Sequence, residues 1–242
     1  MCHEPDARPA VSGPARTALA SAAHVTLEAA DGASVAAYCA LPEIPSGPSV
    51  LVLPDNRGLS PFYESVAERL AEQGHPALAI DYFGRTKELF GLTPAGLDAD
   101  FAAGAAYLRE RVGGGDVAAL GFCFGGRQAL RCAAPGYGFA RVVSFYGYPD
   151  AIGPAPGPLQ LAHELAAPIL ALWGGADEAI PAAMVAAFDA ALEEAGVPHE
   201  FVTYAGAPHS FFDGGAPEFA DASADAWGRV LAFLCYSRPG TE

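Results

Sequence analysis

A cysteine lies inside a glycine-rich run that could expose it as a nucleophile. The run 121–126 reads GFCFGG, and it places Cys123 between Gly121 and Gly125 directly after an apolar segment. Glycines on both sides permit a tight strand-to-helix turn with a close backbone approach. Such a turn lifts the sulfur out of a sheet, and the N-terminus of the following helix favours the thiolate. The pattern predicts acyl chemistry at Cys123, and the alternative is a buried structural cysteine.

A thiol nucleophile needs a base, and the base needs a group that orients it. His209 follows the last expected strand within a Gly/Pro loop, and Asp177 ends a GGAD turn after another apolar run. Both residues then lie at the carboxyl ends of strands, where open α/β sheets form their active sites. The chain order predicts a triad of Cys123, Asp177 and His209. For Asp177 the alternatives are a helix-capping role and replacement by its neighbour Glu178.

The elements that position these residues alternate between strands and helices. An antiparallel hairpin is expected at 24–41, because two short segments flank an Asp-Gly turn. Continuous apolar runs predict further strands, and apolar residues at helical spacing predict the helices. This alternation predicts a mostly parallel central sheet with helices on both faces, and together with the Cys123 turn and the order of the triad residues it indicates an α/β-hydrolase fold. The strands are expected at 48–53, 76–81, 117–121, 141–146, 168–173 and 199–204, and the helices at 61–73, 94–112, 125–133, 181–195 and 217–234.

The amino-acid composition limits the possible domain organisation and binding partners. The 242 residues carry 13 basic and 28 acidic side chains, a net charge of −15, which disfavours nucleic acid and anionic membrane surfaces as partners. We expect an extended N-terminal arm at 1–23, rich in Pro, Ala and Ser, and a single domain at 24–242. Cys2 and His3 are metal-ligating residue types, but within this arm they are interpreted as a solvated tail.

The number and spacing of the cysteines argue against structural disulfide bonds and metal centres. There are five, an odd number at irregular spacing without a C-x-x-C pair, so neither a structural zinc site nor a redox pair is indicated. Cys39, Cys132 and Cys235 lie in apolar contexts and are expected in the core. No signal-peptide or membrane-spanning run is recognised. We expect a cytoplasmic monomer or homodimer without a metal site.

With these residues in place, the chain resembles the dienelactone hydrolase family (carboxymethylenebutenolidase-like) over about residues 24–235. That resemblance implies an α/β-hydrolase fold and a Cys-Asp-His triad without a cofactor. It also implies hydrolysis of a cyclic enol ester to a linear dicarboxylate such as maleylacetate. The motifs that carry it are LPDNRG at 53–58, DYFGR at 81–85, GFCFGG at 121–126, GGAD at 174–177 and GAPHSF at 206–211.

The resemblance also suggests how the thiol is activated and the oxyanion held. Family members have a glutamate after the first buried parallel strand that helps to generate the thiolate, and the matching residue here is Asp55, one methylene shorter. Either Asp55 keeps the role with altered geometry, or activation rests on His209 alone. The backbone N–H of Asn56 would complete an oxyanion hole with that of Phe124.

Two arginines hold the substrate carboxylate in the family. Arg85 matches the first, but the second is missing, because residues 211–213 read FFD. Arg57 is a neighbouring candidate substitute, and a plain surface role is its alternative. Loss of one bidentate arginine would favour a neutral or different ester.

We therefore expect a hydrolase that cleaves a small ester or a dienelactone-like lactone through a thioester acyl-enzyme. One alternative is a carboxylesterase for neutral esters. Another is a non-catalytic or redox-sensing protein with the same fold. An amidotransferase-type thiol elbow also uses G-x-C-x-G, but it lacks the late Asp and His at strand ends.

Overall fold

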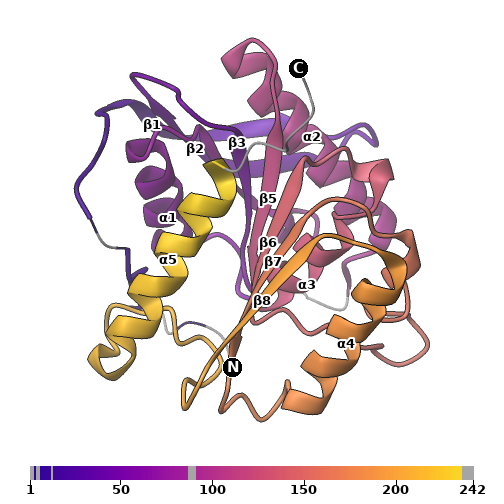
Figure 1. Cartoon of the computed structure of the whole chain (residues 1–242). Coiled ribbons are helices and arrows are strands. Elements are labelled where there is room, and N and C mark those ends of the chain that lie inside the picture. Colours follow the sequence, from indigo (N-terminus) through magenta and orange to yellow (C-terminus); the bar gives the residue numbers. More distant parts are fainter. Residues whose placement is uncertain (1–2, 4–5, 12, 87–90, 236–242) are drawn as a thin grey trace.

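The computed structural model describes residues 3, 6–11, 13–86 and 91–235, and one eight-stranded sheet runs through its centre (Figure 1). The strands are β1 (Leu19–Glu28), β2 (Ser34–Pro42), β3 (Ser49–Leu53), β4 (Ala77–Asp81), β5 (Val117–Phe122), β6 (Arg141–Phe145), β7 (Ile169–Gly174) and β8 (His199–Tyr204). Their order across the sheet is β1-β2-β4-β3-β5-β6-β7-β8. The pairs β1–β2 and β2–β4 are antiparallel, and each following pair is parallel. The predicted fold class is confirmed, including the N-terminal hairpin.

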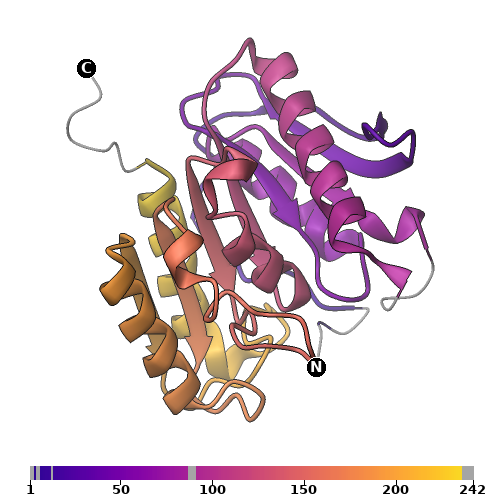
Figure 2. The ribbon, with the colours of Figure 1, turned by 90° about the vertical axis from the view of Figure 1, so that its right-hand side faces the viewer.

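Helices cover both faces of this sheet. The helices are α1 (Pro61–Glu72), α2 (Pro94–Val112), α3 (Phe124–Arg131), α4 (Ala182–Ala195) and α5 (Ala220–Cys235). α1 and α5 lie on one face, while α2, α3 and α4 lie on the other (Figures 1 and 2). Every residue of β3, β5 and β7 is buried, which explains why these strands read as unbroken apolar runs. Among the described residues, no helix is both long and apolar enough to cross a membrane.

The first strand begins earlier than the sequence pattern indicated. β1 starts at Leu19, not at His24, and its added residues pair with the end of β2. Most of β1 is exposed at the sheet edge, so its first half carries no alternation of apolar and polar residues that would reveal a strand. The arm before it is correspondingly shorter than predicted, and the single-domain organisation stays a prediction.

The arm follows α1 toward the carboxyl edge of the sheet. The backbone N–H groups of Arg16 and Thr17 donate to the Glu72 carbonyl at 2.8 and 3.1 Å, at the end of α1. Further along, Arg8 donates its backbone N–H to Asp213 Oδ1 at 3.2 Å and accepts one from Gly214 at 2.7 Å. Backbone hydrogen bonds therefore attach the arm to the end of α1 near Arg16 and to the Asp213–Gly214 loop near Arg8.

A strained turn joins β5 to α3. Its central residue, Cys123, has φ 54° and ψ −113°, a backbone conformation that side-chain-bearing residues rarely adopt. The turn packs against its surroundings so closely that glycine is required on both sides. A Cβ on Gly121 would overlap the Gly125 carbonyl, and a Cβ on Gly125 would overlap the carbonyl oxygens of Leu53 and Pro54. The end of β3 therefore lies directly against the turn that presents Cys123.

This packing predicts that one added methyl group lowers the free energy of unfolding at Gly125 but not at a glycine with open space around it. Gly125→Ala should lower the free energy of unfolding by about 3 kcal/mol or more, because backbone on the facing strand cannot move aside. Gly136→Ala is the matched control, since an added Cβ meets nothing within 4 Å there, and it should stay within about 0.5 kcal/mol of the parent. Urea denaturation measures both. Equal stabilities would contradict the described contact between the turn and β3.

Candidate active site

The site residues come from loops at the carboxyl ends of neighbouring parallel strands. Asp55 follows β3, Cys123 follows β5, Tyr146 follows β6, Asp177 follows β7 and His209 follows β8. β5, β6, β7 and β8 are consecutive in the sheet, so their ends converge on one edge. The sheet topology thus brings the predicted nucleophile, acid and base to the same edge.

Asp177 and His209 form a direct pair. His209 Nδ1 lies 2.6 Å from Asp177 Oδ2, and both side chains are largely buried, with 10% and 2% exposed. The two loops are also joined by backbone, because Ala176 donates to the Ala207 carbonyl at 2.9 Å. The carboxylate therefore fixes the orientation of the ring and favours the tautomer that carries its proton on Nδ1.

The pKa of Asp177 reflects opposing influences. Burial raises it, but the hydrogen bond and charge of His209, together with backbone donors at Ala179 and Ile180, outweigh that burial. The net pKa lies below its ordinary value, so the carboxylate is ionised at neutral pH. An ionised Asp177 can stabilise the imidazolium that forms when His209 accepts a proton.

The second ring nitrogen of His209 is available for proton transfer. Nε2 is buried and has no hydrogen-bond partner among the described residues. Because Nδ1 is engaged by Asp177, Nε2 is the atom that can exchange a proton with a nucleophile or leaving group. The ring also lies against Tyr146, whose ring centroid is 4.9 Å away.

The nucleophile turn has the features that oxyanion stabilisation needs. Phe124 is the first residue of α3, so its backbone N–H lies outside the helix's own hydrogen-bond ladder. Gly125 packs on the end of β3, just before Asp55 and Asn56. These positions support the predicted pair of N–H donors, Phe124 and Asn56, whose role stays a prediction.

Asp55 is held by hydrogen bonds to three other residues. The residue is 1% exposed. Its Oδ1 accepts the Arg57 backbone N–H at 2.9 Å, and its own backbone N–H donates to the Tyr63 hydroxyl at 3.0 Å. Its Oδ2 accepts the backbone N–H of His3 at 3.2 Å. The carboxylate is therefore satisfied by hydrogen bonds within the protein, and its predicted action on the thiol stays a prediction.

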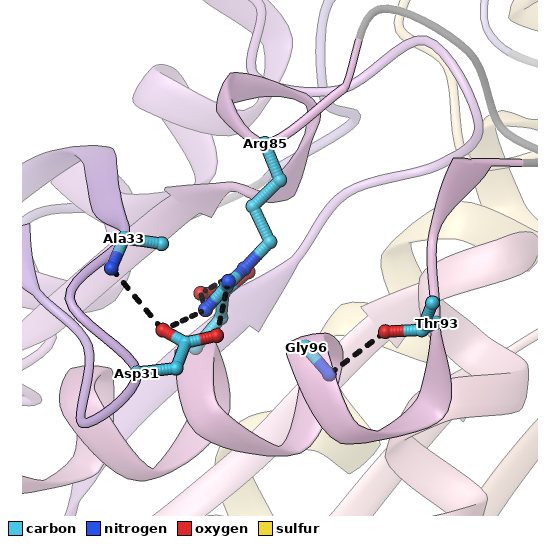
Figure 3. Close-up of polar contacts among 6 residues, drawn as sticks. Asp31, Ala33, Arg85, Thr93 and Gly96 are labelled. Atoms are coloured by element: carbon cyan, nitrogen blue, oxygen red, sulfur yellow. Dashed lines mark hydrogen bonds and ion pairs between the residues drawn. The ribbon is translucent and has the colours of Figure 1, made fainter.

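Arg85 lies in a salt-bridge network beside α2 (Figure 3). Its Nε lies 2.8 and 2.9 Å from the Asp100 carboxylate oxygens, and its Nη atoms reach Asp31 at 2.5 and 3.0 Å. Burial raises the pKa of Asp100, while these contacts lower that of Asp31. Two carboxylates thus share the guanidinium that was predicted to hold a substrate carboxylate.

His3 corrects the interpretation of the arm as a solvated tail. The residue is only 5% exposed, and its ring stacks on Phe62 with centroids 3.9 Å apart. Its Nε2 lies 2.7 Å from the Tyr146 hydroxyl, and its carbonyl accepts a hydrogen bond from the Arg57 guanidinium. Sequence reasoning missed it because the arm has no periodicity and every partner lies at least 52 residues away. Cys2, the other residue of the suggested metal pair, lies outside the described residues.

Tyr146 is a second residue that the sequence did not single out. It is fully buried and has a positive φ of 40°, rare for a residue with a bulky side chain. The only signal was its place as the last residue of the predicted strand 141–146, at the edge where the site forms. Such backbone strain is concentrated at functional sites.

The structure places three of the other cysteines. Cys39 and Cys132 are buried as predicted, but the prediction was wrong for Cys235, which is exposed at the end of α5. Its apolar neighbours face the sheet, while helical spacing turns this last residue outward. No group of three or more metal-ligating side chains occurs within the described part of the chain.

Comparison with known proteins places this fold and site in a family. The mostly parallel sheet, the helices on both faces and the tight β5–α3 turn define an α/β-hydrolase architecture. The family model described as "Dienelactone hydrolase family" matches residues 35–236. The chain therefore belongs to the dienelactone hydrolase family, and with it to the carboxylic ester hydrolases.

Individual relatives agree with this assignment. The "Carboxymethylenebutenolidase" of Rhodococcus opacus is 32% identical over 210 residues, which are 78% of this chain and 81% of the relative. The "Putative carboxymethylenebutenolidase" of Methylorubrum extorquens is 32% identical over 231 residues, covering 86% and 79% of the two chains. A crystal structure described as a "Putative Dienelactone Hydrolase" from Klebsiella pneumoniae is 29% identical, has a TM-score of 0.76 and covers 89% of this chain and 100% of its own.

The network around Arg85 predicts a structural role that can be separated from substrate binding. Arg85→Ala should lower the free energy of unfolding by about 3 kcal/mol, because the Asp100 carboxylate, fully buried, is left without its counter-charge. Arg85→Met/Asp100→Leu should recover most of this loss, since no unpaired charge remains. Unchanged stability in Arg85→Ala, with a raised KM for carboxylated esters alone, would favour the substrate-clamp role.

The environment of His3 predicts an unusual titration. Burial lowers its pKa to about 4, helped by the charges of His209 and Arg57 and opposed by that of Asp213. A lowered pKa means that docking of the ring is fully favoured above pH 6.5 and weakens as the pH falls toward 4, because only the undocked ring takes up a proton in that interval. NMR titration of the histidine rings measures the midpoint, with the exposed His163 as a reference ring in the same spectra. A His3 midpoint near 6.5 would show that the ring is solvated.

Proposed function

We propose that this protein hydrolyses a small ester or lactone through a thioester intermediate on Cys123. The observation that carries the proposal is the buried His209–Asp177 pair, 2.6 Å apart, at the same sheet edge as the strained Cys123 turn. A strained turn keeps the nucleophile exposed, and an oriented imidazole is the base that a thiol requires.

The chemistry proceeds in two balanced steps. In the first, His209 Nε2 takes the proton of the Cys123 thiol, the thiolate attacks the acyl carbon, the ester C–O bond breaks, and the leaving alkoxide or enolate takes that proton from Nε2. In the second, His209 removes a proton from water, the water oxygen attacks the thioester, and the carboxylic acid and the thiolate are released. The N–H groups of Phe124 and Asn56 stabilise the negative oxygen in both steps.

A dienelactone-like enol lactone is the leading substrate class. The name of the Rhodococcus opacus relative refers to this type of compound, and family membership supports it. Enol esters also suit a thiol nucleophile, because the enolate leaves easily. We expect a small-molecule substrate, a cytoplasmic setting and no cofactor.

A carboxylesterase for neutral esters is the second candidate, and a specific observation favours it. The Arg85 guanidinium is shared by Asp100 and Asp31, and residues 211–213 offer no arginine. A site with few free guanidinium donors has less to gain from a substrate carboxylate. Comparing matched lactones with and without a carboxylate separates the two candidates.

Replacement of the triad residues should abolish turnover of an activated ester. Cys123→Ala should lower kcat for p-nitrophenyl acetate by at least about 10³-fold, and Asp177→Asn by about 10²- to 10⁴-fold through the wrong tautomer of His209. Stopped-flow absorbance measures both. Cys235→Ala, which removes an exposed thiol, is the control and should retain full activity.

Two outcomes would count against this mechanism. Retained turnover in Cys123→Ala would remove the nucleophile from the proposal. A wild-type protein that forms a sulfenate at Cys123 but turns over no ester would instead support a redox-sensing role.

A further inference from the structure

An aromatic cage surrounds the side chain of His3. Its walls are Phe62, Tyr63, Phe122 and Tyr146, hereafter the His3 cage. The imidazole stacks on Phe62 at 3.9 Å with an interplanar angle of 25°. The other three rings present their edges or tilted faces with centroids 6.0–6.5 Å away. The cage therefore fits a flat ring.

Three polar groups converge on the same recess. The Tyr146 hydroxyl lies 2.7 Å from His3 Nε2, and Asp55 Oδ2 accepts the His3 backbone N–H at 3.2 Å. The Arg57 guanidinium donates to the His3 carbonyl oxygen. An apolar recess with a few converging polar groups is the usual character of a small-molecule site. Here a segment of the chain itself fills it.

The cage adjoins the catalytic residues. Phe122 directly precedes Cys123, and the Tyr146 ring contacts the rings of both His3 and His209. Asp55 directly precedes Asn56, the second proposed oxyanion donor. A flat ring in the cage would therefore contact Tyr146, which also contacts the base His209, and Phe122, the residue before Cys123.

We propose that the His3 cage is the subsite for a planar five-membered ring with an oxygen acceptor on its substituent, and that His3 occupies this subsite as an intramolecular competitor. The inference rests on the proposed function, because it assigns the ring pocket of that ester site. His3 presents the matching shape: a flat five-membered ring in the cage and, along the same residue, a carbonyl oxygen on Arg57.

Exchange requires His3 to leave three hydrogen bonds and its stack on Phe62, which a bound ring with an oxygen acceptor would replace. The arm's next described anchor on the site side is Arg8, whose backbone bonds to Asp213 and Gly214 lie among exposed or half-buried residues. Chain segments held by a few exposed hydrogen bonds open locally at low cost. A substrate that competes with His3 binds only to molecules in which the cage is empty. Its apparent Kd is therefore its intrinsic Kd divided by the fraction of such molecules.

Removal of the His3 side chain should therefore favour cyclic substrates. His3→Gly should raise kcat/KM for α-angelica lactone, a five-membered enol lactone, by about 5-fold or more through a lower KM. The linear enol ester vinyl acetate, which needs no ring pocket, should change by less than about 2-fold. His3→Phe, which keeps a flat ring in the cage, should behave like the wild type.

Free imidazole provides the direct probe of the vacated cage. It should inhibit His3→Gly competitively against the lactone, and it should leave the wild type and the control His163→Gly unaffected, because His163 is exposed elsewhere. Lack of inhibition of His3→Gly, or a fall in kcat/KM on His3→Gly, would overturn the proposal by making His3 a structural part of the wall.

Binding of imidazole gives a readout that does not need ester turnover. Isothermal titration calorimetry should show imidazole binding to His3→Gly and no binding to the wild type or to His163→Gly. Equal heats in His3→Gly and the wild type would overturn the cage proposal whatever the turnover. Absence of ester and lactone hydrolysis in both His3→Gly and the wild type would contradict the proposed function. Failure of the proposed function and failure of the cage proposal therefore give different results.

Discussion

The close packing of the β5–α3 turn on the end of β3 is the constraint on which the site depends. Cys123 has a backbone conformation that costs of order 1–3 kcal/mol, so the surrounding structure must hold it there. Gly121 and Gly125 allow this, because each lies where a Cβ would overlap backbone. The same contact brings the loop with Asp55 and Asn56 beside the nucleophile.

Satisfied carboxylates are the second organising feature of this acidic chain. Asp177 is paired with His209, Asp100 with Arg85, and Asp55 with backbone N–H groups. A buried carboxylate without such donors would be costly, so each of them fixes the loop that supplies its partner. At Asp55 one of those donors comes from His3, which ties the N-terminal arm to the site.

Local patterns predicted most of the fold and the sheet edge to which the candidate triad residues come. The GFCFGG run specifies its own turn, and strand ends in a parallel sheet share an edge, so Cys123, Asp177 and His209 could be placed from sequence. The start of β1 was predicted at His24 and not at Leu19, because exposed residues at a sheet edge need no alternation of apolar and polar side chains. His3 and Tyr146 were missed because their contact spans 143 residues and depends on tertiary packing. The pairing of Arg85 with Asp100 was hidden for the same reason, since a charge in a loop does not reveal its partner.

Mass spectrometry of the acyl-enzyme tests the central claim most directly. Rapid acid quench of the wild type with a slowly deacylating aryl ester should add one acyl mass, located on the peptide that contains Cys123 and removable by hydroxylamine. If the thioester is an intermediate, this adduct forms and decays at rates compatible with turnover. Ester hydrolysis without an adduct on Cys123, or with the acyl group on another residue, would contradict it.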